Sequence, residues 1–154
     1  MISRHRGRGV PARALNPLVG VLVGRLGVPV PGVRMLRVHG RRSGRLRSVP
    51  VTVTPLEGGR YLVGVRGETD WSRNLESAGW GELIRGSSVE RVRAARVDGE
   101  EACHALSGHV RLHGWATRRL LGAGRNPNAE QLDAIASRVP VFRISTWDSE
   151  HRGN

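Results

Sequence analysis

Arginine is concentrated in one short stretch, RMLRVHGRRSGRLRSVPVTV (residues 34–53), which holds six arginines and no Asp or Glu. Arg41, Arg42 and Ser43 fall in its central turn, and Arg47 follows on the return strand. Guanidinium groups bind phosphate through paired hydrogen bonds, and free turn amides and a hydroxyl add further donors. The pattern therefore predicts an anion-binding turn, with a solvated basic turn that binds nothing as the alternative.

A second stretch, VGVRGETDWSRNL (residues 63–75), combines glycines, a tryptophan and an amide. Gly64 and Gly67 lack a Cβ atom, which lets a flat ligand approach the backbone closely. Trp71 and Asn74 are three residues apart in a predicted helix and therefore share one face. The indole would form a pocket wall and the amide would fix a ligand group. The alternative for Trp71 is a position in the core.

Three histidines, His104, His109 and His113, occur in a segment with helical periodicity. His109 and His113 are four residues apart and share a face, but no cysteine or carboxylate stands at a suitable spacing to complete a metal site. We expect surface or groove positions, with proton donation during a reduction as a further option. Cys103 is the only cysteine, which excludes an intrachain disulfide and is typical of an intracellular protein.

The net charge of +12 is distributed unevenly along the 154 residues. Residues 1–56 contain eleven arginines and no acid, for a charge of +11, whereas residues 57–154 contain 14 arginines and 13 acids, for +1. Charge of one sign indicates an anionic partner, which can be nucleic acid, a membrane surface or a small molecule with phosphate or carboxylate groups. Aromatic residues make up only 4%, and no helix-turn-helix or RNA-recognition motif occurs, which disfavours nucleic acid.

Alternating and helical patterns predict the elements that hold these residues. Strands are expected at 33–40, 46–55 and 60–65 as a meander, then at 80–86, 87–97 and 140–147. Helices are expected at 71–78, with Asp70 as N-cap and Gly79 as stop, at 98–121, with Asp98 and Glu101 in capping-box spacing, and at 129–139. Strands dominate and helices are inserted singly, so we predict a mainly antiparallel barrel of the α+β class.

We expect a single domain over residues 1–154, because this length suits one core. It would comprise a basic N-terminal segment with an amphipathic helix (1–32), the barrel (33–147) and a short tail (148–154). Pro17 is expected to begin the N-terminal helix. The apolar run Leu18–Gly24 is too short to span a bilayer, so this helix either packs on the domain or rests on a membrane surface.

Two motifs in this sequence resemble the deazaflavin-dependent nitroreductase family, split β-barrel proteins that use coenzyme F420. The chain has GRRSGRLRSVP where that family typically has G-R-[KR]-[ST]-G-x-x-R-x-x-P, and DWSRNL where it has D-W-x-x-N-L. The similarity runs from about residue 33 to residue 97 and continues weakly into the last strand. Many relatives have a tyrosine after the tryptophan, where this chain has Ser72, and some use a C-terminal tyrosine, whereas Tyr61 is the only one here.

The resemblance implies a split β-barrel with an FMN-binding-like fold and a groove for F420. The coenzyme carries a phosphodiester and a glutamate tail, which suit a turn rich in arginine and free of carboxylates. Its anionic end would lie on Arg41, Arg42, Ser43 and Arg47, its tail and ring edge along Ser48, Val49, Pro50 and Val51, and its ring past Gly64, Val65, Arg66 and Gly67, with Asp70, Trp71 and Asn74 closing over it.

The implied function is that of a cytoplasmic oxidoreductase that transfers a hydride from reduced F420 to a quinone, nitroaromatic or enone acceptor. No side chain is assigned as catalytic and no metal ligand is expected. Alternatives that stay open are FMN in place of F420, a protein that binds F420 or another anionic cofactor without turnover, peripheral membrane contact through the N-terminal helix, and a homodimer. A nucleic-acid-binding module is the remaining alternative.

Overall fold

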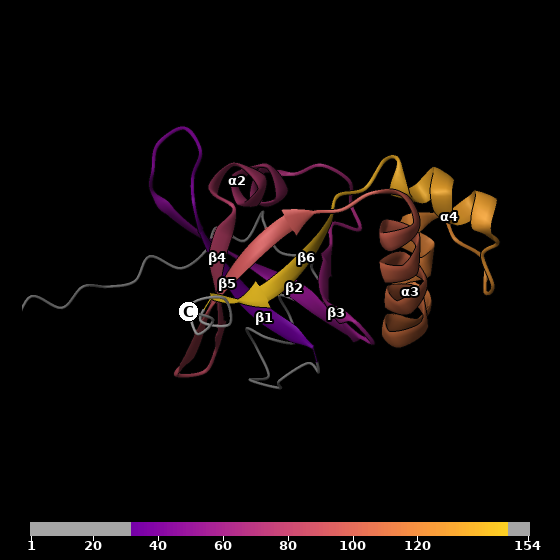
Figure 1. Cartoon of the computed structure of the whole chain (residues 1–154), viewed down its shortest axis with the longest axis horizontal. Helices are drawn as coiled ribbons and strands as arrows, with labels where there is room; N and C mark the ends of the chain where they lie inside the picture. Colours follow the sequence, from indigo (N-terminus) through magenta and orange to yellow (C-terminus); the bar gives the residue numbers. More distant parts are fainter. Residues whose placement is uncertain (1–31, 148–154) are drawn as a thin grey trace, which may run out of the picture.

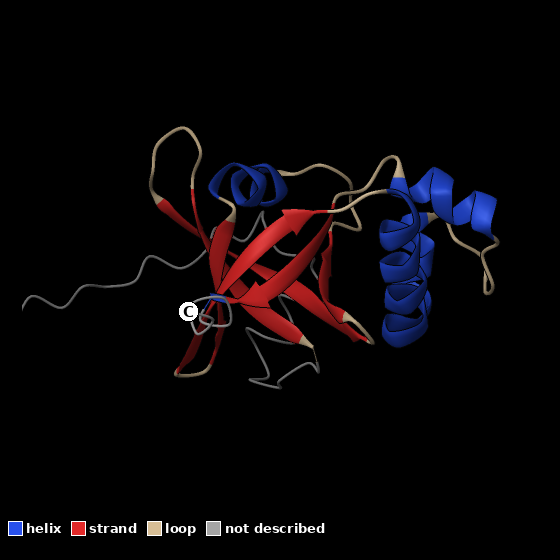
Figure 2. Ribbon diagram, in the orientation of Figure 1, coloured by secondary structure: helices blue, strands red, loops and turns tan. Residues whose placement is uncertain are grey.

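Six antiparallel strands close into a barrel at the centre of the molecule (Figures 1 and 2). The computed structural model describes residues 32–147. The order around the barrel is β1-β2-β3-β6-β5-β4, and β4 pairs with β1 to close it. The strands are β1 (Val33–His39), β2 (Leu46–Leu56), β3 (Gly59–Val63), β4 (Trp80–Arg85), β5 (Ser88–Arg96) and β6 (Val141–Thr146). The predicted antiparallel barrel of the α+β class is confirmed.

Alternating side chains divide the apolar residues between two cores. In β3, Leu62 points into the barrel, whereas Tyr61 and Val63 point outward to a second cluster formed with the helices. In β6, Phe142 faces the interior and Val141 faces the helices in the same way. This two-residue period is the ordinary consequence of strand geometry. One face of β3 and β6 therefore fills the barrel and the other carries the helical layer.

Three helices are described, and each lies in a connection between strands. Helix α2 (Asp70–Ala78) joins β3 to β4, and its fully buried Leu75 packs against the barrel core. Helices α3 (Gly99–Leu121) and α4 (Ala129–Ala136) join β5 to β6 and form a layer beside the barrel (Figure 1). Within α3 the backbone leaves helical geometry at Gly114 (φ 76°, ψ −165°), a conformation that favours glycine.

One cap prediction is wrong, and one is confirmed in position but not in its hydrogen bond. The N-cap of α2 is Thr69 rather than Asp70, which is the first helical residue, and the Ser72 hydroxyl accepts the Thr69 N–H at 3.0 Å. At the start of α3, Asp98 occupies the cap position but its side chain makes no cap hydrogen bond. The Glu101 carboxylate instead accepts hydrogen bonds from the Tyr61 hydroxyl at 3.0 Å and from Arg143 at 2.6 Å. At the start of α3, tertiary partners of Glu101 have thus replaced the local capping bond.

The element boundaries differ slightly from the predicted ones. Strand β3 ends at Val63 rather than Val65, because the Gly64 N–H turns to the Pro140 carbonyl at 2.9 Å. Helix α4 ends at Ala136, before the predicted residue 139. The predicted N-terminal helix and the tail 148–154 lie outside the described residues. Within residues 32–147, no helix is long and apolar enough to cross a membrane.

Candidate anion-binding site and the adjacent cavity

The loop Gly40–Arg45 joins β1 to β2 and projects from the barrel beside α2 (Figure 1). The Gly40 N–H donates to the Arg45 carbonyl and the Gly44 N–H to the Gly40 carbonyl, both at 2.8 Å. The Arg45 N–H donates to the Ser43 hydroxyl at 3.2 Å. Gly44 has φ +68°, a value that glycine adopts without strain. The loop is thus held in shape by its own hydrogen bonds.

These bonds correct one part of the predicted anion site. The turn amides were expected to be free, but the amides of Gly40, Arg41, Gly44 and Arg45 all donate within the protein. The Ser43 hydroxyl already accepts one of them. An anion at this loop would therefore depend chiefly on guanidinium groups rather than on backbone donors.

Three arginines of the loop region are exposed: Arg42, Arg45 and Arg47. Within residues 32–147, no carboxylate lies at ion-pair distance from any of them. Three guanidinium groups with no carboxylate partner among residues 32–147 create a local positive field on one short hairpin. Arg42, Arg45 and Arg47 are called the arginine triad below. Arg42 and Arg47 belong to the predicted site, whereas Arg45 was not predicted as a contact.

Arg41, a predicted contact of the anion, differs from the arginine triad because its side chain is engaged within the protein. Its side chain is only 21% exposed and lies 3.4 Å from the Asp70 carboxylate. Its Nη1 donates to the Asn74 side-chain oxygen at 2.8 Å, and its backbone N–H donates to the same oxygen at 3.1 Å. Asn74 is 5% exposed, so its amide fastens the loop to α2 and does not stand free in a groove.

Trp71 and the β2 residues of the predicted site belong largely to the barrel. The Trp71 ring is half-buried, packs against the barrel core and lies 6.1 Å from the ring of Phe142. Val51 is 7% exposed and belongs to that core, and Val49 packs against it. Ser48 and Pro50 alternate with these valines and are half-buried. Among the predicted β2 contacts Ser48–Val51, these two point away from the barrel core.

The segment Gly64–Gly67 lies on the other side of α2 from the arginine loop (Figure 1). A Cβ atom on Gly64 would stand 2.5 Å from the Pro140 ring, so this glycine is needed for internal packing. Val65 packs against the helical core, and Arg66 is exposed. Thus the structure brings Arg41, Asp70 and Asn74 together, while residues 64–67 lie against the connection from α4 to β6.

His109 and His113 of α3 face the barrel, so the expected surface or groove position is wrong for His109, which is 2% exposed, whereas His104 is exposed as expected. The Thr54 hydroxyl of β2 lies 2.7 Å from His109 Nδ1 and 3.1 Å from His113 Nε2. Burial lowers the pKa of His109 from 6.5 to about 3, and that of His113 is lowered as well. His109 is therefore neutral near pH 7 and carries no proton to donate as an imidazolium. Among the described residues, no three potential metal ligands cluster together.

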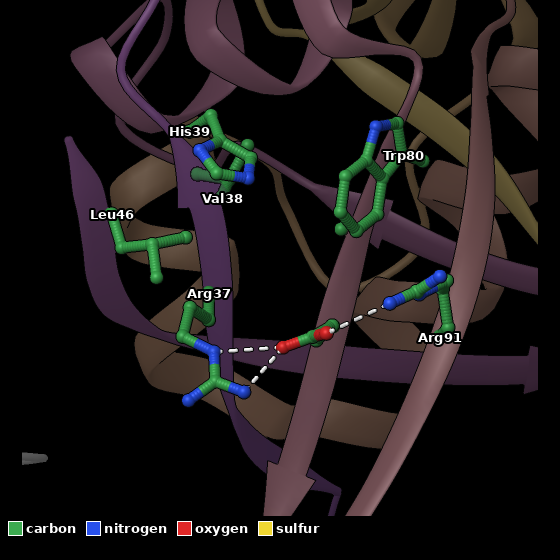
Figure 3. A pocket seen from close by; sticks show the side chains of 8 residues that line it. Arg37, Val38, His39, Leu46, Trp80 and Arg91 are labelled. Atoms are coloured by element: carbon green, nitrogen blue, oxygen red, sulfur yellow. Dashed lines mark hydrogen bonds and ion pairs between the residues drawn. The ribbon is translucent and has the colours of Figure 1, made fainter. Parts of the chain in front are cut away.

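Sequence reasoning missed a cavity of about 200 Å³ beside the arginine loop. Figure 3 shows His39, Leu46 and Arg37 on one side of it and Trp80 and Arg91 on the other. His39 and Leu46 directly flank the loop Gly40–Arg45, so the cavity and the arginine triad are neighbours. The residues that line the cavity are Arg37, Val38, His39, Leu46, Trp80, Gly81, Glu82 and Arg91.

Ion pairs and aromatic contacts organise this cavity. Glu82 accepts hydrogen bonds from Arg37, with an Nε to Oε2 distance of 2.7 Å, and lies 3.6 Å from Arg91. The hydrogen bond from Arg37 lowers the pKa of Glu82, which keeps the carboxylate ionised. The Arg91 guanidinium stands 5.0 Å from the Trp80 ring centre, and the Trp147 ring lies 5.9 Å from Trp80.

The only signal in the sequence for this cavity is the alternation along each strand. Two positions along a strand bring side chains to the same face. This relation holds for Arg37 and His39 in β1, and for Trp80 and Glu82 in β4. Their approach across strands depends on the closing pair of β1 with β4, in which Arg37 stands opposite Glu82. A meander predicted from local patterns does not specify that pairing.

Solved structures share this fold, whereas the sequence matches no family model and no curated protein. An F420-H2 dependent reductase, FDR-A, is 20% identical with a TM-score of 0.50, over 77% of this chain and 100% of that one. A protein described as a domain-swapped dimer is 20% identical with a TM-score of 0.52, over 77% and 83%. HutZ, the heme storage protein from Vibrio cholerae, is 14% identical with a TM-score of 0.50, over 75% and 81%. This chain therefore has the split-barrel fold that these proteins share.

Proposed function

We propose that the protein binds coenzyme F420 and is an oxidoreductase that reduces a quinone, nitroaromatic or enone acceptor. The observation that carries the proposal is the arginine triad, which is exposed and unpaired among the described residues. The phosphodiester and glutamate tail of F420 are the kind of anion that such guanidinium groups bind. The resemblance of the two motifs and the fold shared with an F420-H2 dependent reductase support the same ligand.

The residues present fit the anionic part of this coenzyme. Arg42, Arg45 and Arg47 would bind the phosphodiester and tail, whereas Ser48 and Pro50 alternate with Arg47 along β2 and lie on the opposite face of the strand. Arg41 and Asn74 have a supporting role, because their mutual hydrogen bonds hold the loop against α2. The remaining predicted contacts, along Gly64–Gly67 and at Asp70 and Trp71, stay predictions.

The protein's contribution to the reaction would be binding, orientation and electrostatics. When bound, reduced F420 supplies a hydride, so that the acceptor gains two electrons and takes its proton from water or from a nearby acid. No side chain of this chain has to act as a nucleophile. His109 is excluded as that acid at neutral pH, because its lowered pKa leaves it unprotonated.

Titration of the full chain with F420, followed by coenzyme fluorescence, tests the binding step. We expect saturable micromolar binding of F420, with FMN binding more weakly because it has no glutamate tail. Arg42→Ala and Arg47→Ala should each weaken F420 binding by about 1.5 to 3 kcal/mol, which is about 10- to 150-fold. Arg125→Ala, an exposed arginine after α3, is the matched control and should bind normally. Unchanged affinity in both loop variants would refute the proposal.

Mixing the protein with reduced F420 and a quinone tests the second step. Faster reoxidation of the coenzyme with the protein than without it would support an oxidoreductase, whereas tight binding without reoxidation of F420 by any acceptor class would indicate a binding protein.

A homodimer is the proposed assembly, supported by the similar structure described as a domain-swapped dimer, and light scattering measures it directly. Sequence-specific, salt-resistant DNA binding would favour the nucleic-acid alternative instead.

A further inference from the structure

The cavity beside the arginine loop has the chemistry of a binding site for a small aromatic ligand. One wall is the indole of Trp80, with the Arg91 guanidinium stacked 5.0 Å from its ring centre. The side chains of His39, whose ring centre lies 5.6 Å from that of Trp80, and of the exposed Leu46 lie across from it (Figure 3). At 5.6 Å the two rings contact each other, so they form one aromatic surface against which a planar ring fits, and not a slot that holds a ring between them.

The charged groups of the cavity give it a preference for an anion. Arg37 and Arg91 both lie on Glu82, so two positive charges face one negative charge and the net charge of the three is +1. The Glu82 side chain is only 17% exposed and has both arginines as partners, whereas the Arg91 side chain is 53% exposed. Arg91 therefore keeps donors that can turn to a ligand carboxylate without leaving the indole.

The volume limits the size of the ligand. About 200 Å³ is below the range of about 300 to 1,000 Å³ that is usual for pockets of drug-sized molecules. A whole F420 molecule would not fit in this space, but one ring or two fused rings would. The volume of the cavity therefore suits a second ligand that is smaller than the coenzyme.

We propose that this cavity binds a planar aromatic monoanion of one or two rings, with its ring against Trp80 and its carboxylate or phenolate oxygen on Arg91. The binding itself does not depend on F420.

Calorimetric titration of the full chain with 2-naphthoate, and with its neutral counterpart 2-naphthamide, tests the site. We expect one molecule of 2-naphthoate to bind per chain, at least fivefold more tightly than 2-naphthamide. Arg91→Gln removes the excess charge and should weaken 2-naphthoate binding about tenfold, while leaving 2-naphthamide within twofold. Glu82→Gln raises the local charge to +2 and should tighten 2-naphthoate binding. Arg85→Gln, an exposed arginine at the end of β4, is the matched control and should bind as the wild type does.

Opposite shifts in the two cavity variants are the signature of a site in this cavity, and loss of the fold would not produce them. The proposal is overturned if 2-naphthoate does not saturate, if 2-naphthamide binds equally well, or if the three variants behave alike. Arg47→Ala separates this proposal from the coenzyme proposal, because it should weaken F420 binding and leave 2-naphthoate binding unchanged. Binding of 2-naphthoate without F420 binding would refute only the coenzyme proposal, and the converse would refute only this one.

Discussion

The histidine pair His109 and His113 makes the stability of the fold depend on pH. This dependence lies at higher pH than the range in which carboxylates titrate. His109 is 2% exposed, and its Nδ1 lies 2.7 Å from the Thr54 hydroxyl. That hydroxyl also lies 3.1 Å from His113 Nε2, and the two rings are 4.5 Å apart. A hydroxyl has one donor, so it donates to one ring and accepts from the other. Burial disfavours the charged form of both rings, so protonation of either ring opposes the folded arrangement.

The size of the effect follows from the two pKa values of His109. The folded state holds its pKa at about 3, whereas the unfolded chain has the ordinary value of 6.5. A base with a lowered pKa in the folded state stabilises the fold above the unfolded pKa, and that stability is lost as pH falls from 6.5 toward 3. Between pH 7 and pH 5, the unfolded state gains about 2 kcal/mol relative to the folded state. His113, whose pKa is also lowered, adds a loss of the same sign.

Urea unfolding at pH 7 and pH 5, followed by circular dichroism, measures this loss. The carboxylates with lowered pKa values, Glu82 and Glu90, lose their contribution only below their ordinary value of 4.5, outside this window. His109→Gln keeps a polar group beside Thr54 but cannot titrate, so its stability should fall by about 2 kcal/mol less than that of the wild type. His104→Gln, an exposed control, should match the wild type. Equal losses in wild type and His109→Gln would refute the reasoning.

Two further substitutions test contacts that hold the candidate site in shape. Asn74→Ala removes the buried acceptor between α2 and the arginine loop and should lower the free energy of unfolding by about 1 to 3 kcal/mol in urea, while Ser77→Ala, exposed on the same helix, should change it little. Unchanged stability would show that this amide is not structural. Gly64→Ala places a Cβ atom 2.5 Å from the Pro140 ring and should cost about 1 to 3 kcal/mol by overpacking. Gly124→Ala, with open space around its Cβ position, is the control, and equal melting temperatures for the two alanine variants would contradict the packing argument.

Local sequence predicts the exposure of some residues of the candidate site but not the contacts that other residues make within the protein. The exposure of Arg42 and Arg47 could be anticipated, because a polar turn between two alternating strands has nothing to bury it. The burial of Arg41 could not, because it depends on Asn74, which is 33 residues away in the sequence. The same holds for Gly64, whose missing Cβ makes room for Pro140 rather than for a ligand. In each case a residue type that suits ligand binding is used for a contact within the protein.

The strands and helices follow from local sequence, since the two-residue and 3.6-residue periods of apolar side chains are local properties. The excess of positive charge at the β1–β2 loop follows from it as well, because no carboxylate stands near this loop in the chain. Which arginines form ion pairs depends on the assembled fold, since pairs such as Arg37 with Glu82 join residues 45 positions apart. The burial of His109 and the cavity at Trp80 also depend on the assembled fold. His109 is buried where α3 packs on β2, and the cavity forms where β1 pairs with β4 to close the barrel. Long-range pairing of strands carries no local signal in a single sequence, so these parts of the site become visible only when the barrel is assembled.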